Sequence, residues 1–299
     1  MNVLLFGGNG QVGQALLRTL APLGALVVTT RSGALPDGSP CEVADFDDPA
    51  SLPALLDRIA PDVVVNAAAY TAVDRAEADP DAAWRANAEA PGVIARWCAA
   101  AGVPLLHYST DYVFDGTATR PYREDDPTAP LGVYGASKLA GEQAIRAAGG
   151  RHLIFRTAWV YAAHGANFLR TMLRVGAERD VLRVVADQIG TPTPAALIAD
   201  VSAQILHQRL TLSGTYHLTA TGATSWHGFA EAIFAEAVAR GILPRAPRVE
   251  AITTAEYPTA ARRPAYSCLD VRRLQSDAGL QLPAWQDGLA RVMDAVRGH

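Results

Sequence analysis

The segment "FGGNGQVG" (6–13) follows the short apolar run "NVLLF" (2–6) and leads into a stretch with helical periodicity. It places Gly7, Gly10 and Gly13 at GxxGxxG spacing. Glycine permits a tight turn after a strand and lets backbone N–H groups approach a pyrophosphate at the start of a helix. Because the triplet lies in the first strand–helix unit, it predicts a dinucleotide-binding turn rather than an ordinary glycine-rich loop.

The rest of the first half repeats this alternation of strand and helix. The predicted strands are 2–6, 25–30, 62–68, 104–109 and 152–159. The predicted helices between them are 11–23, 50–60, 80–101 and 133–148. Because the strand segments are apolar throughout, we expect a parallel sheet that is covered on both faces. Strand–helix–strand repetition implies right-handed crossovers and a doubly wound, Rossmann-like α/β fold.

The alternation becomes less regular after about residue 160. Later elements are predicted as a proline-containing loop leading into a helix (187–201), a strand (215–219) and helices at 226–240 and 284–297. We interpret 1–160 as a dinucleotide-binding domain, completed by part of 185–215. The remainder of 161–299 is mainly a smaller substrate-binding lobe over the carboxyl edge of the sheet.

Composition narrows the class of protein. Of the 299 residues 49% are hydrophobic and 19% are charged, so a sizeable core is expected. A net charge of -4 argues against nucleic acid or an anionic membrane as the main partner. Cys41, Cys98 and Cys268 form no CxxC pair, so neither a disulfide framework nor a zinc site is indicated. The first residues lack a basic region and a long apolar run, so a cytoplasmic location is expected.

The end of the second predicted strand bears on the choice of cofactor. NAD-binding sites usually have an acidic residue there, but "TTRSG" (29–33) offers Arg31 instead. A guanidinium pairs with a 2′-phosphate, so NADPH is favoured and NADH is left open; the alternative is an ordinary surface arginine. Asp45 and Phe46 are expected near the adenine. The small residues of "NAAAYT" (66–71) would allow close approach of a cofactor, although helix packing would also explain them.

The segment "VYGASKLAGEQAI" (133–145) places Tyr134 and Lys138 four residues apart on one face of a helix. An ammonium about 4 Å from the phenol favours phenolate by about 4 kcal/mol at an effective dielectric constant of about 20. That attraction lowers the tyrosine pKa by up to ~3 units, toward the range useful for proton transfer. A tyrosine and a lysine at this spacing after a glycine-rich turn therefore predict a catalytic pair.

Polar residues follow the fourth predicted strand, in "HYSTDYVF" (107–114). Hydroxyls at a strand end often only cap a turn. Ligands of open α/β sheets, however, bind beyond the carboxyl ends of the strands. We therefore expect Ser109 and Thr110 to point toward the phenol of Tyr134, where a hydroxyl would orient a substrate carbonyl.

These segments together resemble the dTDP-4-dehydrorhamnose reductases, a family of extended short-chain dehydrogenases. The resemblance covers nearly the whole chain, and its segments occur in the family's order: "LLFGGNGQVG", "NAAAYTAVDRAE", "YSTDYVFDG", "VYGASKLAGE", "RTAWVYA", "NF" (167–168), "DQIGTPT" and "RRPAYSCLD". It implies reduction of dTDP-4-dehydro-L-rhamnose by NADPH, the final step of dTDP-rhamnose synthesis for cell-surface polysaccharide.

The resemblance also implies site residues. The catalytic set is Thr110, Tyr134 and Lys138. Cofactor contacts are implied for Gly7, Gly10, Gln11, Val12, Gly13, Arg31, Asp45, Phe46, Ala67, Ala69, Tyr70, Thr71, Tyr108, Tyr134 and Lys138. Substrate contacts are implied for Val73, Thr110, Asp111, Tyr112, Trp159 and Arg263, with Arg262 equally placed by sequence to meet the substrate's phosphates.

The chain departs from this resemblance at a metal site. Some members of the family are dimers bridged by magnesium through carboxylates on the first helix and on the helix after "GTPT" (190–193). This chain has Ala15 and Ala196 there, so we expect no metal and a monomer or weak homodimer. His107, His164 and His217 are not spaced as metal ligands and are expected to have structural roles.

Two other functions compete with the reductase. A nucleotide-sugar 4-epimerase, or a 4-ketoreductase for another sugar nucleotide, would share the catalytic set; the missing acid after the second strand argues against the epimerase. A non-catalytic regulatory subunit would not need Thr110, Tyr134 and Lys138 together.

Overall fold

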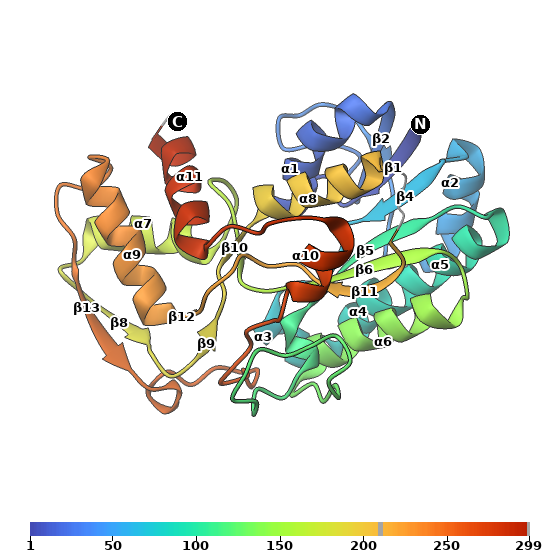
Figure 1. Cartoon of the computed structure of the whole chain (residues 1–299). Helices are drawn as coiled ribbons and strands as arrows, with labels where there is room; N and C mark the ends of the chain where they lie inside the picture. The colour runs from blue at the N-terminus through green and yellow to red at the C-terminus, as the bar shows by residue number, and fades with distance from the viewer. Residues whose placement is uncertain (209–211, 298–299) are drawn as a thin grey trace.

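The computed structural model describes residues 1–208 and 212–297 and contains a sheet-based part and a smaller lobe (Figure 1). The sheet has seven parallel strands in the order β11-β6-β5-β4-β1-β2-β3. Its strands are β1 (Asn2–Phe6), β2 (Ala25–Thr30), β3 (Glu42–Val43), β4 (Val63–Asn66), β5 (Leu105–Thr110), β6 (His152–Thr157) and β11 (Gly214–His217). The predicted fold class, a doubly wound α/β sheet with a smaller lobe, is confirmed.

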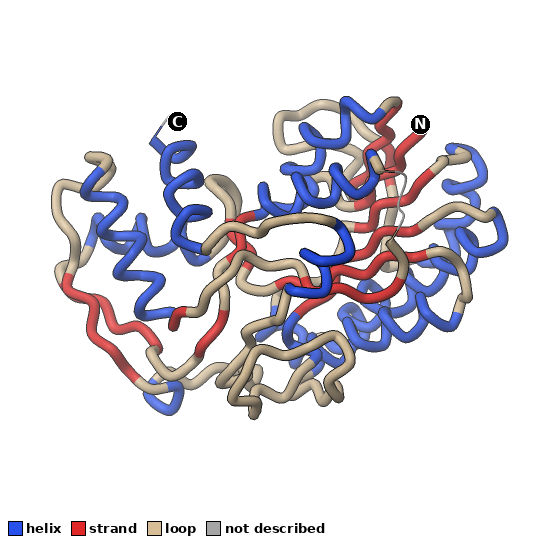
Figure 2. Tube along the Cα trace, viewed as in Figure 1, coloured by secondary structure: helices blue, strands red, loops and turns tan. Residues whose placement is uncertain are grey.

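Helices cover both faces of the sheet (Figure 2). One face packs on α1 (Gln11–Leu20) and α8 (Ala195–His207), and the other on α2 (Leu52–Ile59), α5 (Ala90–Ala101) and α6 (Val133–Ala147). Successive side chains of β1 enter opposite cores, since Val3 and Leu5 lie in the first and Leu4 and Phe6 in the second. This burial on both faces is why the strand is apolar at every position.

The helix predicted at 80–101 has three parts. They are α4 (Pro80–Trp84), a π-helical turn η3 (Arg85–Glu89) and α5. A short helix, α3 (Val73–Ala78), precedes them and was not predicted. The π-helical turn contains the fully buried Asn87.

The lobe has its own hydrophobic core. Its main helices are α7 (Phe168–Glu178), α9 (Trp226–Ala239) and α11 (Trp285–Arg297), and they pack beside the parallel pair β8 (Val181–Val185) and β13 (Arg248–Ile252). Smaller elements are β7 (Val160–Tyr161), β9 (Ile189–Gly190), β10 (Thr193–Pro194), β12 (Thr224–Ser225), α10 (Arg272–Ala278) and the 3-10 turns η1 (Ala21–Leu23), η2 (Pro49–Ser51), η4 (Asp111–Val113) and η5 (Thr254–Glu256). The sequence predicted α9 and α11 but not α7 or the β8–β13 pair.

The chain leaves the sheet after β6, enters the lobe and then returns. On its return α8 packs against α1, and β11 pairs with β6 from Gly214 to His217. The strand predicted at 215–219 is thus the last strand of the sheet. The strand that completes the sheet, β11, therefore follows β7 to β10 and α7 in the sequence.

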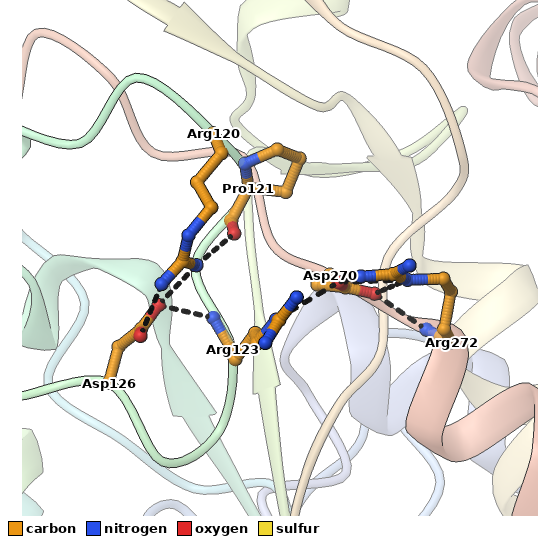
Figure 3. A network of polar contacts seen from close by, with 6 residues as sticks. All are labelled: Arg120, Pro121, Arg123, Asp126, Asp270 and Arg272. Atoms are coloured by element: carbon orange, nitrogen blue, oxygen red, sulfur yellow. Dashed lines mark hydrogen bonds and ion pairs between the residues drawn. The ribbon is translucent and has the colours of Figure 1, made fainter.

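A long loop after β5 is fastened to the segment that precedes α10. Arg120 pairs with Asp126 inside the loop, while Arg123 and Arg272 both approach Asp270 (Figure 3). The backbone N–H of Tyr122 also donates to the carbonyl of Cys268. These contacts bring residues far apart in sequence together below the carboxyl edge of the sheet. Among the helices of residues 1–208 and 212–297, none is long and apolar enough to cross a membrane.

Candidate active site

A cavity of about 700 Å³ lies between the carboxyl ends of the sheet strands and the lobe. Most of the predicted site residues line it: Gly7, Gly10, Gln11, Val12, Arg31, Phe46, Ala67, Ala69, Tyr70, Thr71, Val73, Tyr108, Thr110, Asp111, Tyr112, Tyr134, Lys138 and Trp159. Gly13, Asp45 and Arg263 are not among its lining residues. The structure therefore brings the separate sequence segments to one place.

The glycine turn joins β1 to α1 at one end of the cavity. Gly7 has φ +83, and a Cβ atom on it would lie 2.6 Å from the backbone nitrogen of Ala68. A Cβ on Gly13 would lie 2.0 Å from the carbonyl oxygen of Gly7, so this glycine allows the helix to pack on the turn. The first turn of α1 contains no acidic residue. Its free N–H groups and the positive end of the helix dipole suit a pyrophosphate.

Arg31 lies at the end of β2, where its guanidinium is well exposed. It lies 3.3 Å from a carboxylate oxygen of Asp47 and 3.7 Å from one of Asp45. Phe46 is buried and packs edge-on against Phe6, with ring centroids 5.5 Å apart. Asp45 thus contacts Arg31 rather than lining the cavity, and Phe46 forms part of the wall.

The loop after β4 is held from behind by Asn87. The Asn87 amide accepts a hydrogen bond from the Tyr70 backbone N–H at 2.9 Å and donates to the Tyr70 carbonyl at 3.0 Å. It also donates to Ser137, whose hydroxyl donates to the carbonyl of Tyr134. Asn87 therefore connects the Ala67–Thr71 wall to the helix that carries the catalytic candidates, a role that the sequence alone did not reveal.

Thr110 and Tyr134 meet in the cavity. Burial raises the pKa of Tyr134 to about 12 and the Asp111 charge adds to the rise, while a hydrogen bond with Thr110 acts in the opposite direction. The prediction that Lys138 brings the Tyr134 pKa down toward neutral is therefore wrong for this structure. The physical reason is that burial disfavours the phenolate and the lysine has other partners.

Lys138 lines the cavity and is buried, at 2% exposure. Its Nζ atom donates to the backbone carbonyl of Tyr108 at 2.6 Å and lies 3.2 Å from Nε2 of His107. Burial lowers the Lys138 pKa to about 8, and the charge of Glu142 acts in the opposite direction. Lys138 is thus a base whose charge changes close to neutral pH.

Ser109 was predicted to point toward Tyr134, but it does not. Its hydroxyl donates to the buried carboxylate of Glu142 at 2.6 Å, and Arg156 donates to the same carboxylate at 2.7 and 2.9 Å. Ser109 also lines the cavity, but its hydroxyl is held by Glu142, since neighbouring side chains on a strand point to opposite faces. The hydroxyl next to Tyr134 is therefore that of Thr110, and Ser109 helps to fix the end of β5.

Asp111 is buried beside Thr110 and accepts a hydrogen bond from its hydroxyl at 3.0 Å. Burial raises the Asp111 pKa to about 7. Tyr112 packs edge-on against Tyr134, with centroids 5.7 Å apart. These residues form the side of the cavity next to the phenol.

The lobe supplies the opposite wall. Trp159 has φ +48 and stacks on Trp226, with ring centroids 3.5 Å apart and planes 4° apart. The Trp159 ring lies over Gly190, where a Cβ atom would come within 2.4 Å of it. Asn167 also lines the cavity and donates to Gln11 at 2.8 Å. Trp226 and Asn167 were not predicted as site residues; the "NF" segment (167–168) was the only signal for the second.

Arg263 lies beside the cavity and is paired. Its guanidinium donates to both carboxylate oxygens of Asp74, at 3.1 and 2.6 Å. Arg262 lines a small adjacent hollow together with Val73 and Tyr112. The structure therefore distinguishes the two arginines, which were equivalent by sequence. Arg263 is fixed to α3, whereas Arg262 lines the hollow.

The two alanines at the expected metal position have different surroundings. Ala15 is buried in α1, in the core shared with α8, whereas Ala196 on α8 is exposed. Across the portion of the chain covered by the structure, no group of three or more His, Cys, Asp or Glu side chains is placed to hold a metal ion.

Comparisons with known proteins agree on one family. The model of the "RmlD substrate binding domain" family matches residues 1–297. A dTDP-4-dehydrorhamnose reductase of Shigella flexneri is 46% identical over 299 residues, which is 99% of this chain and 98% of that protein. One from Burkholderia thailandensis is 48% identical over 295 residues, 96% of each chain.

A solved structure extends the agreement to three dimensions. The dTDP-4-dehydrorhamnose reductase of Bacillus anthracis, in complex with NADP, superposes with a TM-score of 0.88 at 35% identity, covering 98% of this chain and 99% of that one. The resemblance noted from the sequence is thereby confirmed. The chain belongs to the RmlD substrate binding domain family and, within it, to the dTDP-4-dehydrorhamnose reductases.

Proposed function

We propose that this protein reduces the 4-keto group of dTDP-4-dehydro-L-rhamnose with NADPH and so forms dTDP-L-rhamnose, the final step of dTDP-rhamnose synthesis for cell-surface polysaccharide. The observation that carries the proposal is the meeting of Thr110 and Tyr134, with Lys138 behind them, in the same cavity as a glycine turn. The high identity to proteins named for this activity supports the choice of substrate.

The cavity fits a dinucleotide cofactor. The pyrophosphate and the adjoining sugars would be held by the glycine turn, the N-terminus of α1 and the small residues after β4, all of which line the cavity. The turn is this tight because Gly7 and Gly13 lack a Cβ atom, which would overlap the backbone. When bound, NADPH would supply the hydride that C4 of the sugar accepts.

Tyr134 is the proposed proton donor to O4 of the sugar. With a pKa of about 12 the phenol carries its proton at neutral pH, as an acid catalyst requires. After transfer the phenolate must be stabilised, and the hydrogen bond between Thr110 and Tyr134 acts in that direction because it lowers the phenol pKa. Lys138 would hold the nicotinamide ribose, and its positive charge would offset the phenolate. Thr110 would also orient the substrate oxygen.

The remaining predicted contacts fit the same arrangement. Val73, Asp111, Tyr112 and Trp159 would contact the sugar nucleotide, and the Arg262–Arg263 segment would meet its diphosphate. Arg263 is paired with Asp74, so Arg262 is the freer of the two to meet the phosphates. Arg262 also lines the same small hollow as Tyr112, one of the residues proposed to contact the sugar nucleotide.

NADPH is the proposed cofactor, with NADH accepted more weakly. The basis is Arg31 at the end of β2, where its guanidinium is 65% exposed and close to Asp45 and Asp47. Arg31→Ala should weaken NADPH binding several-fold and leave NADH binding nearly unchanged, as measured by fluorescence titration. Arg85→Ala is the matched control, since Arg85 also approaches Asp47. Equal losses for both cofactors in Arg31→Ala would show that Arg31 does not contact the 2′-phosphate.

The substrate is tested by following NADPH oxidation with dTDP-4-dehydro-L-rhamnose, its UDP analogue and the free keto sugar. We expect turnover with the first and none with the free sugar, because binding energy from the nucleotide supports the chemical step. Preference for the UDP analogue would indicate a 4-ketoreductase of another sugar nucleotide. Cofactor-dependent interconversion of 4-epimers would indicate an epimerase. Tight NADPH binding with no oxidation would indicate a regulatory subunit.

We further propose that residues 1–160, completed by α8 and β11, form the NADP-binding domain and that the rest forms the substrate-binding lobe. The packing of α8 on α1 and the pairing of β11 with β6 support this division. The proposal includes a cytoplasmic monomer or weak homodimer without a bridging metal, because Ala15 and Ala196 provide no oxygen ligand for magnesium.

A further inference from the structure

A chain of buried polar groups runs behind the cavity wall from β4 to α6. The backbone N–H of Ala68 donates to Oδ1 of Asn66 at 3.1 Å. Nδ2 of Asn66 lies 3.1 Å from Nδ1 of His107, and Nε2 of His107 lies 3.2 Å from Nζ of Lys138. Asn66, His107 and Lys138 are all buried, at 1%, 0% and 2% exposure. These contacts involve side chains and are separate from the backbone hydrogen bonds that join the strands of the sheet.

The chemistry of these groups fixes the direction of the hydrogen bonds. A backbone N–H can only donate, so the atom of Asn66 that faces Ala68 must be its carbonyl oxygen. The NH₂ group of Asn66 therefore faces His107 and donates to Nδ1. A neutral imidazole that accepts at Nδ1 carries its proton on Nε2. That N–H is directed at Lys138.

The imidazole has no alternative arrangement at the same cost. Burial lowers the pKa of His107 well below its usual value, so the ring stays neutral, and a charged Lys138 would lower that pKa further. Moving the ring proton to Nδ1 would set it against the NH₂ group of Asn66. Rotating the Asn66 amide to relieve that contact would set its NH₂ group against the N–H of Ala68. Each alternative leaves two buried donors facing each other.

We propose that His107 is a positioning residue for the reduction, which donates from Nε2 to the neutral amine of Lys138 and thereby favours that amine over the ammonium. A neutral amine has a lone pair to accept this hydrogen bond, whereas an ammonium has three donors and no acceptor. The ammonium would face an N–H at 3.2 Å, and among the residues that the structure describes only the Tyr108 carbonyl accepts a hydrogen bond from it.

The charges around Lys138 do not remove this effect. Glu142, one turn further along α6, is the charged group that favours the ammonium, and it is already paired with Arg156 and hydrogen-bonded to Ser109. Burial lowers the Lys138 pKa to about 8 in the same direction as the proposed hydrogen bond. Lys138 is therefore poised to change its charge when its surroundings change.

The consequence for the enzyme rests on the proposed function. The ribose hydroxyls of the nicotinamide half would offer Lys138 acceptors in addition to the Tyr108 carbonyl. Lys138 would then take up a proton from solvent as the cofactor binds, so that Nζ gains a hydrogen and a positive charge. The ammonium needed beside Tyr134 would thus form as the cofactor binds.

The first test examines the tautomer directly, in the cofactor-free protein and without substrate. Nitrogen-15 NMR of histidine-labelled protein at pH 9 should show a protonated Nε2 and an unprotonated Nδ1 for His107. Asn66→Asp should reverse this, because a carboxylate keeps the bond from Ala68 and can only accept from Nδ1–H. A protonated Nδ1 in the unaltered protein, or a doubly protonated ring, would overturn the proposal whether or not the protein is a reductase.

The second test measures proton uptake on NADPH binding at pH 8.5, by calorimetry in buffers of different ionisation enthalpy. His107→Gln should reduce the uptake to less than half, because the glutamine oxygen accepts from the ammonium and so preforms it. His217→Gln is the matched control, as His217 is equally buried in the sheet but has no contact with Lys138. Equal uptake in the unaltered protein and His107→Gln, with binding intact, would refute the role of His107.

Discussion

The two walls of the cavity are built in different ways. The sheet wall consists of backbone at the ends of β1, β4 and β5 and of buried polar side chains such as Thr110 and Lys138, at 5% and 2% exposure. The lobe wall consists of side chains that lie on one another, chiefly the Trp159–Trp226 stack. A wall made of backbone has one shape, whereas a wall made of stacked rings can adapt to its ligand. We infer that the first serves cofactor and proton transfer and the second serves substrate selection.

The largest expected effect sharpens this contrast at the sheet wall. Tyr134→Phe should lower kcat by about 10²- to 10⁴-fold, the usual contribution of a positioned general acid, and leave NADPH binding within a few-fold. Tyr112→Phe is the matched control, because the two rings are in contact and only one hydroxyl is the proposed donor. Turnover close to normal in Tyr134→Phe would mean that another group supplies the proton.

Gly13→Ala examines the backbone of the same wall. The added Cβ would meet the Gly7 carbonyl at 2.0 Å, so the turn must shift. We expect a loss of stability of about 1–3 kcal/mol and NADPH binding weakened by roughly tenfold or more, measured by urea unfolding and titration. At Gly10 the nearest atom would lie 3.5 Å away, so Gly10→Ala should leave stability nearly unchanged. Equal stability of the two variants would contradict the packing described for Gly13.

Trp226→Ala examines the lobe wall. Removing one ring of the stack should raise KM for the sugar nucleotide by about tenfold while NADPH affinity stays within twofold, since aromatic stacking contributes on the order of 1 kcal/mol. Trp97→Ala is a suitable control, because Trp97 donates to Asp57 on the far face of the sheet. A loss of NADPH affinity as large as the rise in KM would break the division of labour between the walls.

The smallest expected effect concerns the pH dependence of stability. Burial raises the pKa of Asp111 to about 7 from an ordinary value of 3.8, so the folded protein holds this proton more tightly than the unfolded chain. Its contribution is therefore present below about pH 4 and is lost as the pH rises toward and through 7. Asp111→Asn should flatten the fall in unfolding free energy between pH 5 and pH 8 by on the order of 1 kcal/mol. If the unfolding free energy of Asp111→Asn fell with pH as it does in the unaltered protein, a group other than Asp111 would be responsible for the fall.

The sheet wall could be predicted from sequence and the lobe wall largely could not. Gly7, Tyr134 and Thr110 belong to local patterns, in which a turn, a helix face or a strand end determines where the side chain lies. Trp159 and Trp226 are 67 positions apart and meet only because the lobe folds as it does, so no local pattern links them.

Some features of the sheet wall could not be predicted from sequence either, and the cause is similar. The sequence predicted that Lys138 would lie close to Tyr134, but the pKa of each depends on burial and on partners from other strands. The contacts of His107 and Asn87 were missed for this reason, since their partners come from β4, from the loop after it and from α6. The helix at 80–101 was predicted in extent, but its π-helical turn has no distinct pattern of apolar residues.

The late arrival of β11 has a consequence for synthesis on the ribosome. Until residues 214–217 emerge, β6 has a neighbour on one side only and presents an unpaired edge with free backbone donors and acceptors. The nascent chain must make part of the lobe before this edge can be closed, and such long-range pairing is slow. The sheet is therefore completed only after the chain has passed through the lobe, and a nascent chain that stalls before β11 would carry an edge open to aggregation.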